Sequence, residues 1–109
     1  MFDTIDREEL EEKLERDENL TLLEVLGPEE YQRSHIKGAI NIPLSEIGRE
    51  AEEKLESDEE IVVYCANSDC QASPQAAKKL VNLGYNRVYD YAGGKQDWKE
   101  AGNPMIEEE

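Results

Sequence analysis

Short runs of hydrophobic residues alternate along the chain with stretches in which hydrophobic residues recur every three or four positions. The runs predict buried β-strands, and the periodic stretches predict helices with one apolar face. The predicted strands are Leu20–Val25, Ile40–Ile42, Ile61–Tyr64 and Val88–Tyr91. Strands that alternate with helices form a mainly parallel sheet that is covered on both sides. The sequence therefore predicts an α/β fold with an open central sheet and helices on both faces.

Capping residues indicate where the predicted helices begin. Asp6, with Glu9 three positions later, is typical of the start of an N-terminal helix. Pro28 fits the first position of a short helix, where the missing N–H has no helical partner. Ser45 and Ser73 are expected to cap two further helices, because a Ser hydroxyl accepts hydrogen bonds from the free N–H groups of a helix start.

Glycines mark the ends of the last elements. Gly84 suits a left-handed cap at the end of the helix that begins near Ser73. Gly93-Gly94 is expected to form the turn before a closing helix over Lys95–Ala101. Because no linker or repeat interrupts this series, we expect one domain over residues 1–109, with 107–109 as a frayed acidic tail.

Cys65 lies where the strand Ile61–Tyr64 ends and a short polar loop leads to the next helix. Ligands of an open parallel sheet bind beyond the carboxyl ends of its strands. A thiol in this position lies among backbone N–H groups and near the positive end of a helix dipole, and both stabilise a thiolate. Taken alone, a small buried Cys at a strand end is also common as a packing residue.

Short sequence blocks stand in a characteristic order along almost the whole chain. They are Leu22-Leu23-Glu24-Val25, Pro28-Glu29-Glu30-Tyr31, residues 35–43, Ile61-Val62-Val63-Tyr64-Cys65, Leu83-Gly84-Tyr85, and Tyr91-Ala92-Gly93-Gly94 with Trp98 and Gly102. This series closely resembles the single-domain rhodanese-like (sulfurtransferase) family. Two places differ from the family pattern. The loop after Cys65 is longer and lacks the usual Arg or Lys, and the usual Asp-Val-Arg of the early strand reads Glu24-Val25-Leu26.

The resemblance implies a reaction and a set of site residues. Cys65 would be the catalytic residue, taking a sulfane sulfur from a donor and passing it to a thiol or cyanide-type acceptor. The chemistry requires no cofactor. The loop residues expected to bind the substrate are Ala66, Asn67, Ser68, Asp69 and Gln71.

Cys70 follows Cys65 closely enough for the two sulfurs to meet. It is a candidate resolving thiol that attacks a modified Cys65 and leaves a disulfide, and packing against the sheet is the alternative. We expect no metal site, because zinc generally takes four ligands and the chain offers two Cys and one His, His35.

Charge and composition narrow the choice of partners. The 27 Asp and Glu residues against 12 Lys and Arg give a formal net charge of −15. Such a chain is not expected to bind nucleic acid, whose phosphates require cations, although a basic partner protein is compatible with it. We expect neither a membrane span nor a secretory leader, and two cysteines without a leader predict a reducing, cytoplasmic location.

Two other functions agree with parts of the sequence. A non-catalytic or redox-sensing rhodanese-like binding module would use Cys65 and Cys70 to report oxidation. A thiol phosphatase or arsenate reductase is disfavoured, because Gln71 stands where such enzymes place the Arg that binds the oxyanion.

Overall fold

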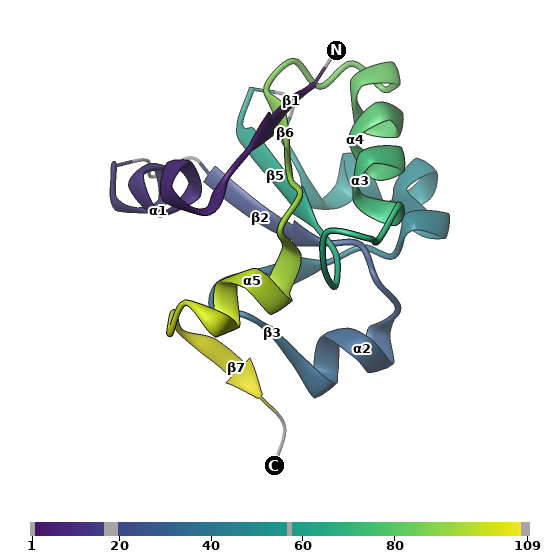
Figure 1. Ribbon diagram of the computed structural model, residues 1–109. Helices are drawn as coiled ribbons and strands as arrows, with labels where there is room; N and C mark the ends of the chain where they lie inside the picture. Colours follow the sequence, from purple (N-terminus) through teal and green to yellow (C-terminus); the bar gives the residue numbers. More distant parts are fainter. Residues whose placement is uncertain (1, 17–19, 57, 108–109) are drawn as a thin grey trace.

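The structure, a computed structural model, describes residues 2–16, 20–56 and 58–107. Its centre is a five-stranded parallel sheet with the strand order β1-β6-β5-β2-β4 (Figure 1). The strands are β1 (Asp3–Ile5), β2 (Leu20–Glu24), β4 (Ile40–Asn41), β5 (Glu60–Tyr64) and β6 (Val88–Tyr91). The predicted open parallel sheet is confirmed.

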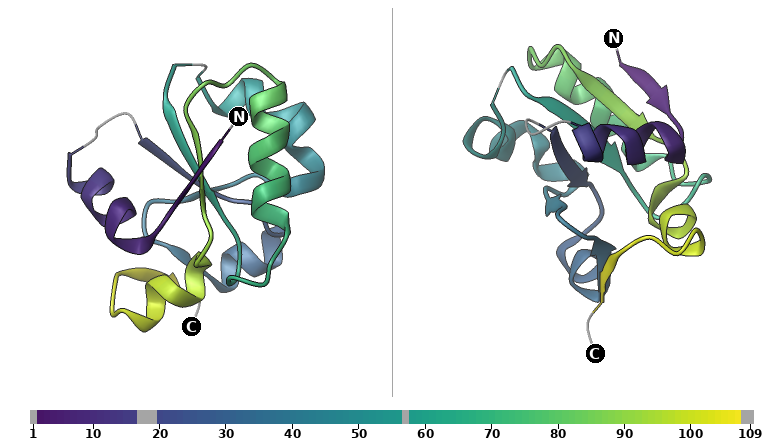
Figure 2. Two further views of the ribbon diagram at one scale, coloured as in Figure 1. Left: turned by 45° about the horizontal axis from the view of Figure 1, so that its top comes forward. Right: turned by 90° about the vertical axis from the view of Figure 1, so that its left-hand side faces the viewer.

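Helices cover both faces of this sheet, as the two views of Figure 2 show. On one face lie α1 (Arg7–Arg16) and α5 (Gly94–Glu100), and on the other lie α3 (Ile47–Lys54) and α4 (Ala72–Asn82). The helix α2 (Pro28–Arg33) and a 3-10 turn (Leu44–Glu46) connect the strands at the carboxyl end of the sheet.

The central strand β5 shows why its sequence reads as a continuous hydrophobic run. Every residue of β5 is buried. Ile61 and Val63 belong to the core beneath α3 and α4, whereas Val62 and Tyr64 belong to the core beneath α1 and α5. Both faces of the strand are therefore covered, as is usual in parallel sheets.

Two of the predicted helix signals are observed in detail. The backbone N–H of Glu9 donates to the Asp6 carboxylate at 2.9 Å, and the N–H of Asp6 donates to the Glu9 carboxylate at 3.2 Å, which forms a capping box. Gly84 follows α4 with a φ of +106°, and the N–H groups of Gly84 and Tyr85 bond back to the carbonyls of Val81 and Leu80.

The serine caps were predicted wrongly. Ser45 lies inside the 3-10 turn, and α3 begins after Glu46. Helix α4 begins at Ala72, after Gln71 as N-cap, so that Ser73 is the second helical residue and Pro74 the third. Ser73 is buried and hydrogen-bonds Asp90. Pro74 still removes no helical hydrogen bond, because the first N–H groups of a helix have no partner within it.

A second, two-stranded antiparallel sheet was not predicted. It pairs β3 (Ser34–Ile36) with β7 (Met105–Glu107), and it lies beside α5 (Figure 1). Glu107, expected in a frayed tail, is the last residue of β7, and its carboxylate pairs with Lys99 at 2.8 Å. The tail residues Glu108 and Glu109 lie outside the described residues.

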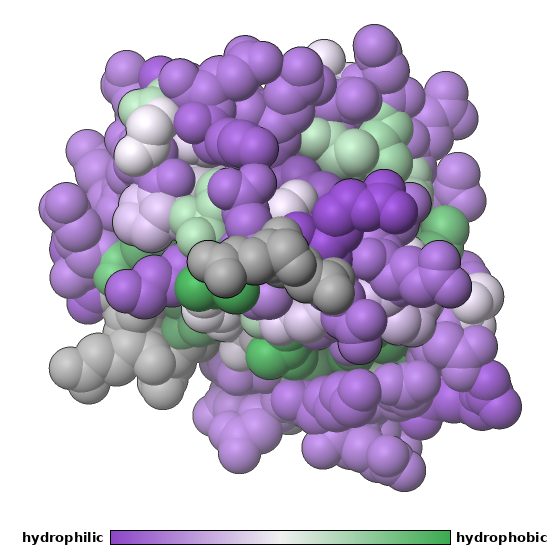
Figure 3. Space-filling model, turned by 90° about the horizontal axis from the view of Figure 1, so that it is seen from below, coloured by the Kyte–Doolittle hydropathy of each residue, from purple (hydrophilic) through white to green (hydrophobic). Residues whose placement is uncertain are grey.

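Within the described ranges, none of the helices combines the length and the apolar character needed to cross a bilayer. Figure 3 shows the side on which α2, α5 and β7 lie, and its surface is mainly hydrophilic with small, separate hydrophobic spots. A partner that docks on this side would therefore meet polar and charged groups first.

Candidate active site

Cys65 is the first residue after β5 and is 1% exposed. Its side chain belongs to the hydrophobic cluster between the sheet and helices α3 and α4, which also includes Val63 and Ala76. The neighbouring strands β2 and β6 pair with β5 on either side. Cys65 thus lies at the carboxyl end of the central strand, at the place that the sequence predicted.

The loop from Ala66 to Gln71 connects Cys65 to α4. Within it, the N–H of Cys70 donates to the carbonyl of Asn67 at 3.1 Å, and the N–H of Asp69 donates to the Asn67 side chain at 3.0 Å. These bonds form a turn with Ser68 and Asp69 exposed at its tip. Gln71 is also exposed, whereas Ala66 and Asn67 are half-buried.

The turn brings Cys70 back to Cys65, and the two residues form a disulfide with their Cα atoms 6.3 Å apart. Cys70 is half-buried and packs against the same cluster as Cys65. The structure therefore joins the two cysteines that the sequence analysis singled out.

Helix α5 holds the start of the loop through backbone contacts. The N–H of Lys95 donates to the carbonyl of Cys65, and the N–H of Gln96 donates to that of Ala66, both at 2.9 Å. Gly94 permits this approach, since a Cβ there would lie 2.6 Å from the Cys65 carbonyl oxygen and 2.7 Å from the Asn67 nitrogen. Gly94 also has a φ of +71°, a conformation that L side chains rarely adopt.

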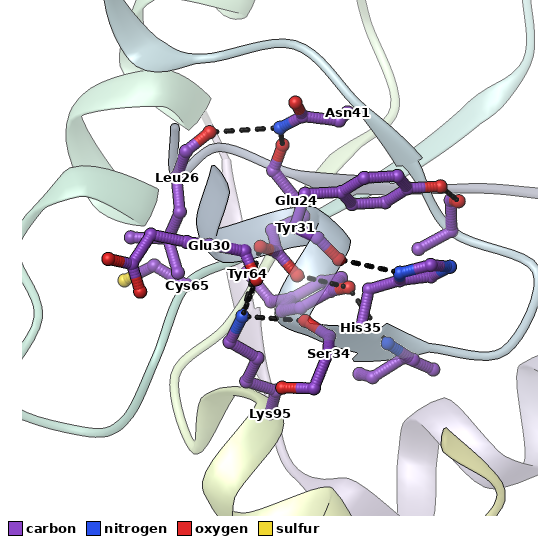
Figure 4. Close-up of polar contacts among 12 residues, drawn as sticks. Glu24, Leu26, Glu30, Tyr31, Ser34, His35, Asn41, Tyr64, Cys65 and Lys95 are labelled. Carbon is purple, nitrogen blue, oxygen red and sulfur yellow. Dashed lines mark hydrogen bonds and ion pairs between the residues drawn. The ribbon is translucent and has the colours of Figure 1, made fainter. Parts of the chain in front are cut away.

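The Lys95 side chain forms a buried ion pair that sequence reasoning missed (Figure 4). Its ammonium group lies 3.1 Å from the carboxylate of Glu24, which is fully buried at the end of β2. It also donates to the carbonyls of Glu30 and Ser34. A carboxylate at the end of a buried strand requires a cation or several donors, and that requirement was the available signal.

Glu24 connects this ion pair to the residue before Cys65. The Tyr64 hydroxyl donates to the Glu24 carboxylate at 2.9 Å and accepts the N–H of Ile36 at 3.1 Å. Burial raises the pKa of Glu24, and Lys95 opposes that rise. Burial, together with the charge of Glu24, also raises the pKa of Tyr64, which keeps its hydroxyl protonated as a donor.

Asp90 is a second buried carboxyl near the start of α4. It lies on β6 opposite Val63, is 5% exposed, and its Oδ1 has no hydrogen-bond partner among the described residues. Burial raises its pKa, and the hydrogen bond with Ser73 opposes that rise. Sequence reasoning assigned no role to Asp90 and gave Ser73 the wrong one.

The His35 side chain is held in place by Tyr31. Its ring stacks on Tyr31 with 3.9 Å between ring centroids, and its Nδ1 lies 2.8 Å from the Tyr31 carbonyl oxygen. Across the part of the chain that the structure describes, no cluster of three His, Cys, Asp or Glu side chains is arranged to hold a metal ion.

The sequence matches a known family model over most of its length. Residues 6–101 match the family described as "Rhodanese-like domain". A solved structure of a rhodanese-related protein from Thermoplasma volcanium superposes with a TM-score of 0.83 at 34% identity, covering 98% of this chain and 100% of that one.

Three curated relatives show where similar chains occur. The putative sulfur carrier protein YrkF of Bacillus subtilis is 35% identical over 86% of this chain and 49% of its own length. The HTH-type transcriptional regulator Rv0324 of Mycobacterium tuberculosis is 39% identical over 96% of this chain and 45% of its own. A sulfurtransferase of Allochromatium vinosum is 30% identical over 97% of this chain and 96% of its own.

The chain spans about half the length of the first two of these relatives and nearly the whole length of the third. The family match and the superposition on the rhodanese-related structure agree with each other. The chain belongs to the rhodanese-like domain family.

Proposed function

We propose that this chain is a sulfurtransferase or persulfide carrier in which Cys65 takes up a sulfane sulfur and hands it to a thiol or cyanide-type acceptor. The observation that carries the proposal is the position of Cys65, at the carboxyl end of the central strand with its carbonyl fixed by the N–H of Lys95 at 2.9 Å. Relatives named as a sulfurtransferase and as a putative sulfur carrier support it.

In the proposed reaction the reduced Cys65 thiolate attacks the sulfane sulfur of the donor. A new S–S bond forms, the bond between that sulfur and the donor breaks, and the electron pair leaves with the donor. The acceptor nucleophile then attacks the terminal sulfur and returns Cys65 as a thiolate. A reducing compartment such as the cytoplasm would keep Cys65 available for this cycle.

The surroundings of Cys65 favour donors that carry little negative charge. Residues 66–71 include no Lys or Arg, and Asp69 adds a carboxylate. Leu26, which stands where the family has a cation, packs against the hydrophobic cluster that contains Cys65. With a net charge of −15, the protein would repel a dianion such as thiosulfate and accept neutral or protein-bound persulfides more readily.

The same charge supports a basic protein as donor or acceptor. Figure 3 shows a mainly hydrophilic surface on the side of α5, near which the loop lies. A cavity of about 280 Å³ beside the loop is lined by Asn67, Ser68, Gly93, Gln96, Asp97 and Glu100. These polar and acidic groups would recognise a partner by charge and hydrogen bonding.

A redox-sensing binding module is the second candidate function. The Cys65–Cys70 disulfide favours it, and one relative is named as a transcriptional regulator, of which a chain like this forms about half. In such a protein the disulfide would change the loop, and a partner would read that change.

Thiocyanate formation tests the proposed function. Reduced protein is mixed with a persulfide donor and cyanide, and Cys70→Ser, which keeps the Cys65 thiol, should form thiocyanate whereas Cys65→Ser should not. Far-UV circular dichroism of Cys65→Ser controls for folding. Full thiocyanate formation by a folded Cys65→Ser variant would overturn the proposal. If the wild type forms the disulfide but Cys70→Ser, which keeps the Cys65 thiol, takes up no sulfur, the sensing module is supported instead.

A further inference from the structure

The disulfide between Cys65 and Cys70 shows that the two sulfur atoms meet within the fold. The separation of their Cα atoms, 6.3 Å, lies in the ordinary range for disulfides. A thiol held this close acts at an effective concentration in the millimolar range or above. Cys70 is therefore placed to react with whatever Cys65 carries.

The two cysteines are held in different ways. Cys65 directly follows β5, and α5 fixes its carbonyl through the N–H of Lys95. Cys70 belongs to the turn that its own N–H closes onto the Asn67 carbonyl, with Ser68 and Asp69 exposed at the tip. This difference assigns the roles, because the fixed residue is suited to receive a substrate and the residue on the turn is suited to approach afterwards.

The exposure of the two cysteines indicates which sulfur of the disulfide a reductant attacks. Cys65 is 1% exposed, whereas Cys70 is half-buried and adjoins the exposed tip of the turn. A reductant that approaches from solvent therefore reaches Cys70 first. Its attack on the Cys70 sulfur would release Cys65 as the free thiolate.

The charges beside the loop favour loss of an anion from Cys65. Residues 66–71 supply no cation to hold a persulfide anion, and Asp97 and Glu100 line the adjacent cavity. The Lys95 ammonium is already paired with Glu24 and bound to the carbonyls of Glu30 and Ser34. Among the described residues around the loop, no free cation is therefore available to hold the terminal sulfur when it leaves Cys65 as an anion.

We propose that Cys70 discharges the Cys65 persulfide internally, so that the chain reduces sulfane sulfur to sulfide. The inference rests on the proposed function, since Cys65 must first carry the sulfur. The Cys70 thiolate attacks Sγ of Cys65, the bond from Sγ to the terminal sulfur breaks, and its electron pair leaves with that sulfur. The proton lost by Cys70 ends on the leaving group, which departs as hydrosulfide.

The electrons balance in this step. The sulfane sulfur gains two electrons and becomes sulfide, and the two cysteines lose two electrons and become the disulfide seen in the structure. A dithiol reductant, small or protein-borne, then restores both thiols. The overall reaction consumes a sulfane sulfur and a dithiol and yields sulfide and a disulfide.

The test is a single turnover without oxygen. Fully reduced protein, freed of external thiol, is mixed with an equimolar persulfide donor, and sulfide release and intact mass are followed. The wild type should release one sulfide per chain and end lighter than the reduced protein by two hydrogen atoms. Cys70→Ser should instead become heavier by one sulfur atom and release sulfide only after an external thiol is added.

Two controls make the outcomes separable. The double variant Cys65→Ser, Cys70→Ser measures sulfide that the donor releases by itself. The wild-type rate should not change on dilution of the persulfidated protein, since the attacking thiol is tethered, whereas release from Cys70→Ser should scale with the added thiol.

Each contrary result has one meaning. A wild type that keeps the extra sulfur atom, with Cys70 free, would overturn the internal discharge while the proposed function stands. A Cys70→Ser variant that gains no sulfur would contradict the proposed function itself. Sulfur mapped to Cys70 in the wild type would show a relay between the two cysteines and would overturn the discharge step.

Discussion

The N–H of Lys95 donates a 2.9 Å hydrogen bond to the carbonyl of Cys65, while the side chain of the same lysine pairs with Glu24 at 3.1 Å. One residue of α5 therefore holds both the start of the loop and the end of β2. The two partners of this ion pair stand far apart in the sequence, and only the fold brings them together.

Replacing Lys95 with Met should destabilise the protein strongly at neutral pH. The variant leaves the fully buried Glu24 without a cation, and breaking a buried pair in this way costs about 3–5 kcal/mol. Urea unfolding checks this, with Lys99→Met as a control, since Lys99 pairs with Glu107 at the surface.

The loss of stability in Lys95→Met should also depend on pH. Below its ordinary pKa of 4.5, Glu24 is protonated in both the folded and unfolded states, and the loss should then be smallest. It should grow as the pH rises, because folding must then bury an unpaired carboxylate or hold it protonated. An equal loss of stability below pH 4.5 and at neutral pH would contradict the ion-pair account.

Gly94→Ala should disturb the loop, because the added Cβ would overlap the Cys65 carbonyl and the Asn67 nitrogen. Gly102→Ala is the matched control, since its φ of +84° carries similar backbone strain but nothing lies within 4 Å of its Cβ. We expect each to lose about 1–2 kcal/mol from left-handed strain. Only Gly94→Ala should also slow sulfur transfer, by about tenfold or more, and equal transfer rates for both variants would count against α5 as the support of the loop.

Asp90→Asn should make the free energy of unfolding less dependent on pH than it is in the wild type. The folded-state pKa of Asp90 is raised above its ordinary value of 3.8, so its favourable contribution is present below that value and lost as the pH rises through the folded-state pKa. The variant should therefore gain stability relative to the wild type as the pH rises from acidic to neutral. Urea unfolding across pH checks this, with the exposed Asp58→Asn as control; a constant difference would contradict it.

Gln71→Arg should improve the use of thiosulfate. A single cation near 4 Å from a bound anion contributes about 1 kcal/mol in a water-like dielectric, which corresponds to roughly fivefold in KM. Gln75→Arg makes the same charge change on the exposed surface of α4 one helical turn further on and should change KM less. The wild-type rate with thiosulfate should rise with ionic strength, and a fall with added salt would show that charge repulsion does not limit this donor.

The sequence predicted the parts of the structure that depend on local patterns. The hydrophobic run of β5 and the change to helical periodicity after it placed Cys65 at a strand end, and the Asp6–Glu9 pair and Gly84 were found as expected. These features depend on residues within a few positions of one another. Local periodicity and capping chemistry are therefore sufficient to find them.

Features that depend on long-range contacts were missed. The Lys95–Glu24 pair joins residues that only the folded sheet brings together. Ser73 has the residue type of an N-cap, but its hydroxyl faces Asp90, a residue on another element. The strands β3 and β7 have three residues each, which is too few for a periodic pattern. Their pairing depends on the direction in which the chain continues after α5.

The most direct test of the account is to locate the sulfur after exposure to a persulfide donor. The Cys70→Ser variant is used so that the sulfur is not discharged, free thiols and persulfides are alkylated, and fragment masses distinguish residue 65 from the other positions. The account predicts one additional sulfur atom on Cys65 and its complete loss on addition of cyanide, with an equivalent amount of thiocyanate formed. The protein is fully reduced before it meets the donor. If Cys65 is then alkylated as an ordinary thiol and carries no added sulfur, the central claim is contradicted.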